Sequence, residues 1–123
     1  MPPRRITVIE DDENIAGLLE FMLRVEGFVP SIFRDGRAAL QHVRDDRPPD
    51  AVVLDHMLPY CDGLAVASAM RADPRWSTVP ILLLRSSAPP ASGGARLVDA
   101  CLTKPFDPGA LVANLKKLVE DAP

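Results

Sequence analysis

The sequence has few cysteines and no long uninterrupted apolar segment. Its 123 residues include only Cys61 and Cys101. Their spacing fits neither a zinc site nor a disulfide framework, so we take both as free thiols. No segment approaches the ~20 apolar residues that a membrane-spanning helix needs, and no apolar signal segment follows Met1 to Arg5. We therefore expect a cytoplasmic protein with no membrane segment.

The sequence also lacks a concentrated basic segment. Its 14 Lys and Arg residues are scattered among 17 acidic residues, which gives a formal charge of −3. Because nucleic-acid binding depends on a positive field, we expect no direct contact with DNA or RNA. A chain of this length, 47% hydrophobic, can bury one core but not two, so we expect residues 1–123 to form a single domain.

Short apolar runs alternate along the chain with segments of helical period. The expected strands are residues 6–9, 28–33, 51–54, 81–84 and 99–103. The expected helices cover residues 15–25, 39–43, 64–71 and a segment from Asp107 onward. Residues 86–94 are rich in proline, glycine and serine, so the helix between the last two strands should be short or irregular. This order predicts a doubly wound α/β domain, with a five-stranded parallel sheet and helices on both faces.

In such folds the functional crevice lies beyond the carboxyl ends of the strands. The residues that end or follow the apolar runs are Glu10-Asp11-Asp12, Asp55, Arg85-Ser86 and Lys104. Several carboxylates in one crevice repel one another unless a cation lies among them. Mg²⁺ prefers oxygen ligands, and Asp11 and Asp55 are the candidates to supply them. With the metal bound, Asp55 could attack a phosphorus atom while Lys104 pairs with a phosphoryl oxygen, which would form an aspartyl phosphate.

Three separated motifs resemble the signature of the two-component response-regulator receiver domain. They are Glu10-Asp11 after the first strand, Asp55 with Met57-Leu58-Pro59 and Gly63, and Lys104-Pro105-Phe106 before the last helix. The resemblance covers nearly the whole chain. It implies a flavodoxin-like receiver fold with no effector domain on this chain.

The resemblance also implies a role for each matching residue. Asp55 would be the phosphoacceptor, and Mg²⁺ would be held by Asp55, Asp11 and the backbone carbonyl of Met57. Glu10 would act on the metal mostly through water, and Lys104 would form the salt bridge with the phosphate. The family also implies a cis bond between Lys104 and Pro105.

Two positions depart from the family pattern. Where the family has Ser or Thr directly after the fourth strand, this sequence has Arg85, and Ser86 follows one residue late. Either Ser86 binds the phosphoryl group through a shifted strand end, or the hydroxyl is absent and the charged fork of Arg85 reaches the phosphoryl oxygens. The position of the family's switch aromatic is Cys101, so rotation of a Tyr or Phe cannot report phosphorylation here.

Several of these residues also have a purely structural interpretation. Asp12 and Glu13 fit the N-cap and first turn of a helix, and Asp11 shares that possibility. Asp55 fits an Asx-turn, and Lys104 a solvated strand end.

The histidines and cysteines are not expected to be catalytic. A dyad of His56 with Asp55 is disfavoured because adjacent strand residues point to opposite faces. We expect His42 at the surface and Cys101 packed as a small hydrophobe. Nothing in the sequence indicates a reactive thiol at Cys61.

The favoured function is a receiver that is phosphorylated on Asp55 by a histidine kinase or a histidine phosphotransfer protein. Its output would be binding to an unidentified downstream protein, and it would be a monomer or weak dimer. The alternative is a pseudo-receiver, a binding module that works without phosphorylation. A phosphatase of the haloacid dehalogenase type needs a second acid two residues after the nucleophile, where Met57 stands, so we expect no enzyme of that kind.

Overall fold

The computed structural model describes residues 2–86 and 97–121. The strands are β1 (Arg5–Ile9), β2 (Val29–Phe33), β3 (Ala51–Asp55), β4 (Ile81–Arg85) and β5 (Ala100–Thr103). The helices are α1 (Glu13–Val25), α2 (Gly36–Asp45), α3 (Gly63–Ala72) and α4 (Pro108–Asp121). The helix expected between the last two strands would fall largely on residues 87–96, which lie outside the described residues. No helix of the described ranges is both long and apolar enough to cross a bilayer.

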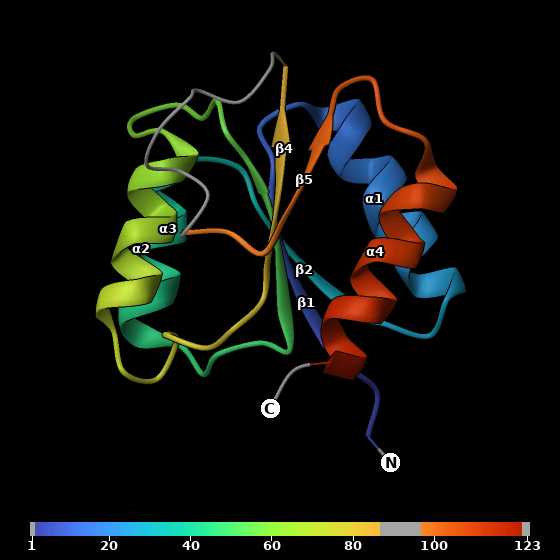
Figure 1. The fold of residues 1–123 in the computed structure, drawn as a ribbon. Coiled ribbons are helices and arrows are strands. Elements are labelled where there is room, and N and C mark those ends of the chain that lie inside the picture. The colour runs from blue at the N-terminus through green and yellow to red at the C-terminus, as the bar shows by residue number, and fades with distance from the viewer. Residues whose placement is uncertain (1, 87–96, 122–123) are drawn as a thin grey trace.

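The five strands form one parallel sheet in the order β2-β1-β3-β4-β5. Helices α1 and α4 cover one face of the sheet, and α2 and α3 cover the other (Figure 1). Because every strand pair is parallel, the carboxyl ends of all five strands lie at the same end of the sheet. The doubly wound fold predicted from the alternation of elements is confirmed.

Two apolar cores flank the central strands. Along β4, Leu83 packs in the core beneath α2 and α3, whereas Leu84 packs in the core beneath α1 and α4. All five residues of β3 and all five of β4 are buried, which explains why these runs are continuously apolar rather than alternating. The last helix buries Leu111, Leu115 and Val119 against the second of these cores, whereas Val112 and Leu118 on the same helix are only half-buried.

Aspartates cap the N-termini of three of the helices. The Asp12 carboxylate accepts hydrogen bonds from the backbone N–H groups of Asn14 and Ile15, at 2.9 and 3.0 Å. Asp35 and Asp62 cap α2 and α3 in the same way. The capping interpretation of Asp12 is therefore confirmed, and this cap fixes the start of α1 directly after the acidic segment.

Two expectations from the sequence are wrong. His42 is buried, with 5% of its surface exposed, because it lies one turn after Ala39 on the face of α2 that packs on the sheet. Cys101 is exposed rather than packed. It lies on the edge strand β5, where half-buried Ala100 and Leu102 face the α4 side and the alternate residues are exposed.

Candidate functional site

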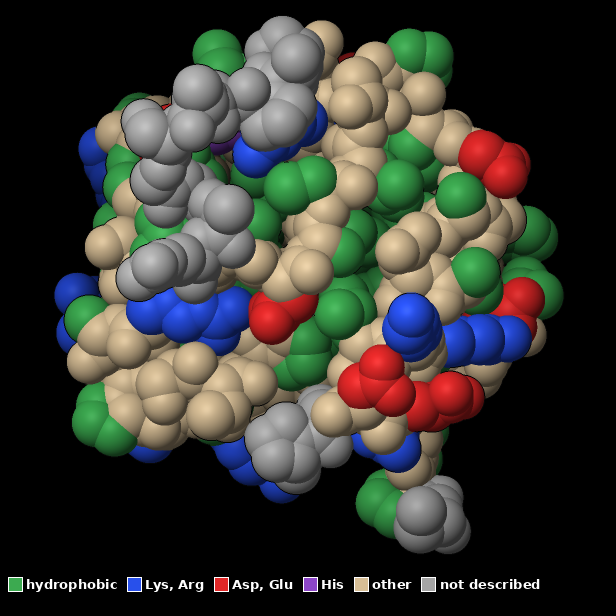
Figure 2. All heavy atoms as spheres, viewed as in Figure 1, with side chains coloured by type: hydrophobic (Ala, Val, Ile, Leu, Met, Phe, Trp, Pro, Cys, Tyr) green, Lys and Arg blue, Asp and Glu red, His purple; other side chains and the backbone are tan. Residues whose placement is uncertain are grey.

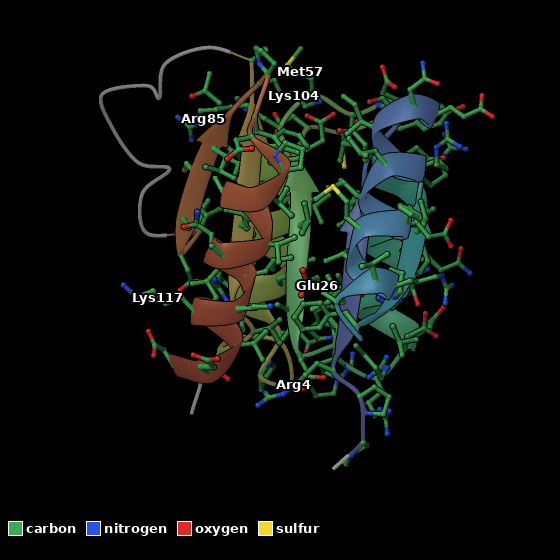
Figure 3. The ribbon with its side chains drawn as sticks, turned by 90° about the vertical axis from the view of Figure 1, so that its right-hand side faces the viewer. Arg4, Glu26, Met57, Arg85, Lys104 and Lys117 are labelled. Atoms are coloured by element: carbon green, nitrogen blue, oxygen red, sulfur yellow. The ribbon has the colours of Figure 1, made fainter. Side chains whose placement is uncertain are left out.

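The predicted site forms where β1, β3 and β5 end. Glu10 follows β1 directly, Asp55 is the last residue of β3, and Lys104 follows β5 directly. The Lys104 Nζ atom lies 2.9 Å from Glu10 Oε1 and 3.1 Å from Asp55 Oδ2. Lys104 and Met57 lie together at this end of the sheet in Figure 3. The sheet therefore brings together residues that are separated by up to ninety-four positions in the chain.

Three carboxylates cluster at this end of the sheet. Glu10, Asp11 and Asp55 each offer one oxygen, and these oxygens all lie within 4.8 Å of one another. Glu10 is 0% exposed and Asp55 is 3% exposed, whereas Asp11 is exposed to solvent. A compact set of carboxylate oxygens, open on one side, fits a hard divalent cation such as Mg²⁺. The donor chemistry thus agrees with the magnesium site expected from the sequence.

The charged groups of this cluster shift one another's pKa values. Burial, together with the neighbouring Asp55 carboxyl, raises the pKa of Glu10 to about 7. Burial opposes the charge on Lys104, but its hydrogen bonds with Glu10 and Asp55 outweigh that effect and raise the pKa of Lys104. One lysine does not balance three acids, so the cluster favours binding of a further cation or of a proton.

The loop after β3 presents Asp55 to the crevice. The Met57 N–H group donates to Asp55 Oδ1 at 3.2 Å, which is the Asx-type contact considered from the sequence. The Gly63 N–H group donates to the His56 carbonyl at 2.7 Å and closes the loop. A side chain at Gly63 would collide with the backbone carbonyl of Asp55. Glycine is therefore needed at this position of the motif for steric reasons.

The segment that carries Asp11 is held by a residue that the sequence did not indicate. Arg34 follows β2, and its Nη2 atom donates to the Asp11 backbone carbonyl at 2.8 Å. The Asp12 N–H group also donates to Glu10 Oε2, at 3.1 Å. These contacts fix the backbone between β1 and α1. No local pattern around Arg34 could have revealed a contact with a residue 23 positions away.

The two departures from the family pattern lie at the ends of β4 and β5. Arg85 is the last residue of β4 and is 3% exposed, and Ser86 beyond it is exposed. The Arg85 carbonyl accepts from the Lys104 N–H group at 2.7 Å. In the described ranges, no hydrogen bond or ion pair joins the Arg85 side chain to Asp55. The structure therefore brings together Glu10, Asp11, Asp55 and Lys104, while the Arg85 guanidinium and Ser86 remain outside this cluster.

Comparison with known families supports the same interpretation. The family model described as the response regulator receiver domain matches residues 6–116. The chain is 40% identical over 116 residues to the DNA-binding response regulator MtrA of Mycolicibacterium paratuberculosis, covering 92% of this chain and 50% of that protein. It is 39% identical to the transcriptional regulatory protein PrrA of Mycobacterium leprae, with 94% and 49% covered. The chain thus spans about half the length of these curated relatives.

Solved structures share the fold over nearly the whole chain. The receiver domain of the sensor histidine kinase PA1611 from Pseudomonas aeruginosa PAO1 superimposes with a TM-score of 0.86 at 27% identity, covering 97% of this chain and 99% of that one. That structure holds a magnesium ion in its active-site cleft. A sensor protein from Polaromonas sp. JS666 gives a TM-score of 0.88 at 31% identity, covering 98% of each chain.

Proposed function

The chain belongs to the response regulator receiver domain family, and from this we propose that it accepts a phosphoryl group on Asp55 from a histidine kinase or a histidine phosphotransfer protein. The observation that carries the proposal is the placement of the Asp55 carboxylate. It lies 3.1 Å from the Lys104 ammonium group and within 4.8 Å of the oxygens of Glu10 and Asp11. A nucleophile, a phosphate-binding cation and a set of metal ligands therefore meet at one point.

In the proposed transfer, an electron pair of one Asp55 oxygen forms the new bond to phosphorus. The bond between phosphorus and the donor's imidazole nitrogen breaks, and its electron pair leaves with the imidazole. Lys104 binds an oxygen of the incoming phosphoryl group through its ammonium charge. Asp11, Asp55 and the Met57 carbonyl would hold Mg²⁺, with Glu10 acting mostly through water. When bound, the metal would offset the negative charge that builds up between the carboxylates and the phosphoryl group.

The test is the intact mass of the protein after incubation with acetyl phosphate and Mg²⁺. The wild type should gain the mass of one phosphoryl group. Asp55→Asn should gain none, and neither should the wild type in EDTA. Asp45→Asn is the matched control, because it removes an exposed acid of α2 that pairs only with Arg44 among the described residues. It should gain one phosphoryl group, as the wild type does.

The alternative is a pseudo-receiver that binds a partner without phosphorylation. It is favoured by Arg85 and Cys101, which replace the hydroxyl and the aromatic residue of the family's switch. If the wild type gains no phosphoryl group from acetyl phosphate or a phosphohistidine donor, and binds no beryllofluoride, the alternative replaces our first proposal. Chemistry on a separate substrate is not part of either function.

An apolar groove lies between α1 and α4. The groove has a volume of about 450 Å³ and is lined by Phe21, Met22 and Val25 of α1 and by Pro108, Val112 and Ala113 of α4. Phe21 is 64% exposed and Val25 is 69% exposed, which is unusual for large apolar side chains. Glu26, labelled in Figure 3, forms an ion pair of 2.7 Å with Lys116 at the groove.

We propose no direct contact of this chain with nucleic acid. MtrA carries the description DNA-binding, but this chain covers only half of that protein. Basic side chains on the face shown in Figure 2 are dispersed among acidic and neutral ones rather than gathered in a patch. A single receiver with a formal charge of −3 lacks the positive field that phosphate backbones require.

A further inference from the structure

Arg85 has a buried charge that the described residues do not satisfy. Its side chain is 3% exposed, and within residues 2–86 and 97–121 no group accepts a hydrogen bond from its Nε or Nη1 atoms. Burial of guanidinium N–H groups without acceptors is costly, because the lost hydration is not replaced. Such a group favours any conformation in which an anion comes within its reach.

The Arg85 side chain starts beside the proposed phosphorylation site but on the other face of the sheet. Asp55 pairs in register with Leu84, whose side chain lies on the α1 and α4 face. Strand alternation places the next residue, Arg85, on the α2 and α3 face together with Leu83. In Figure 3 the Arg85 side chain lies apart from Lys104 and Met57. Arg85 is the last residue of β4, so no further residue of this strand lies between its side chain and the crevice.

Small side chains on β5 leave space for this long side chain. Thr103 is the register partner of Arg85, and Cys101 is the diagonal neighbour on the same face. Diagonal neighbours in a sheet are within reach of long side chains, so a large residue at position 101 would compete with Arg85 for this face. Cysteine does not, and Cys101 is exposed. The two departures from the family pattern are therefore sterically complementary.

We infer that Arg85 is the residue that detects the phosphoryl group in this protein. In the unphosphorylated protein its side chain starts on the α2 and α3 face, where Thr103 and Cys101 are its neighbours by strand register. When Asp55 carries a phosphoryl group, the guanidinium turns over the end of β4, and its Nε and Nη1 atoms donate to phosphoryl oxygens. One side chain then performs both tasks that the family divides between a hydroxyl and an aromatic ring. This inference rests on the proposed phosphorylation of Asp55.

The first test measures the affinity for beryllofluoride, a phosphoryl analogue, in the presence of saturating Mg²⁺. Loss of a charge-assisted contact should weaken binding about 10- to 100-fold in Arg85→Gln and Arg85→Ala. Arg44→Ala removes an exposed arginine of α2 and should bind as the wild type does. Equal affinities of the wild type and both Arg85 variants would overturn the inference. If the wild type itself binds no beryllofluoride and gains no phosphoryl group, the proposed function fails instead.

A second test follows the movement directly, by the Nε–H resonance of Arg85 in a ¹⁵N NMR spectrum. This resonance is assigned as the one that is absent from the spectrum of Arg85→Gln. Beryllofluoride with Mg²⁺ should shift it and slow its exchange with water, because the Nε–H group gains an acceptor. An unchanged resonance at saturating beryllofluoride would rule out the proposed contact.

Discussion

Two clusters of buried polar groups lie in this small domain, and they differ in how completely they are paired. In the first, both ring nitrogens of His42 have partners: Nε2 lies 2.9 Å from the Thr7 hydroxyl, and Nδ1 lies 2.6 Å from the Asp46 carboxylate. The ring stacks on Phe33 and meets the edge of Trp76. In the second cluster, the crevice, one ammonium group pairs with two of three clustered carboxylates.

This difference separates a structural cluster from the proposed phosphorylation site. Buried polar groups whose partners are complete stabilise one conformation, whereas an unbalanced group of charges remains costly until a ligand arrives. The order Thr7, His42, Asp46 is similar to a hydrolytic triad. Thr7, however, is 1% exposed, so no substrate can reach its hydroxyl. Geometry alone would suggest a catalytic triad at His42, whereas burial together with charge balance favours the crevice as the candidate site.

The largest expected effect is the loss of stability in His42→Ala. The substitution leaves the buried Thr7 hydroxyl without its partner and removes the ring that packs between Phe33 and Trp76. We expect the free energy of unfolding to fall by about 3 kcal/mol. Urea denaturation followed by circular dichroism measures it, with the exposed neighbour Gln41→Ala as a control expected within about 0.5 kcal/mol of the wild type. A change that small in His42→Ala would show that the first cluster is not structural.

The sequence predicted the fold and the crevice for the same reason. Continuous apolar runs such as β3 are buried on both faces, and the carboxyl ends of parallel strands lie at the same end of the sheet. Once the strands are located, Glu10, Asp55 and Lys104 must lie near one another whatever the length of chain between them. The residues at the strand ends were therefore sufficient to predict the position of the candidate site.

The errors arose where a residue's environment depends on packing between distant elements. His42 was expected at the surface because its partner Thr7 is 35 positions away, on a strand that otherwise looks apolar. Its spacing of three from Ala39 was the available signal. Cys101 was expected to pack, but its exposure follows from the position of β5 at the sheet edge, which local pattern does not reveal. Arg34 was missed because the backbone carbonyl that it contacts, that of Asp11, is 23 positions away in the chain.

The second prediction concerns pH in the metal-free protein. Because Glu10 has a pKa of about 7 when folded and 4.5 as its ordinary value, the folded protein retains a proton between these values that the unfolded chain releases. The free energy of unfolding should therefore fall as the pH rises from 4.5 to 7. Urea denaturation in EDTA across this range measures the fall. Glu10→Gln should flatten it, and parallel profiles of wild type and variant would show that Glu10 does not cause it.

The third prediction compares the replacement of an aspartate by asparagine in each of the two clusters. In EDTA, Asp55→Asn should raise the free energy of unfolding by about 1 kcal/mol, because it relieves repulsion with Glu10. Asp46→Asn should lower the free energy of unfolding by up to about 1 kcal/mol, because it weakens the bond to His42. Urea midpoints compare the two variants with the wild type. A shift of the same sign in both would remove the distinction between the clusters.

The smallest expected effect concerns Arg34, which contacts the crevice only through the Asp11 backbone carbonyl. Arg34→Ala should loosen the segment that carries Asp11, because one hydrogen bond of 2.8 Å is lost while every metal ligand is retained. We expect the affinity for Mg²⁺ to fall about two- to fivefold, as for the loss of one modest hydrogen bond, with little change in stability. Isothermal titration calorimetry measures it, and Arg44→Ala controls for the lost charge. If both variants lose affinity equally, the effect is one of net charge, and the backbone of Asp11 does not depend on Arg34.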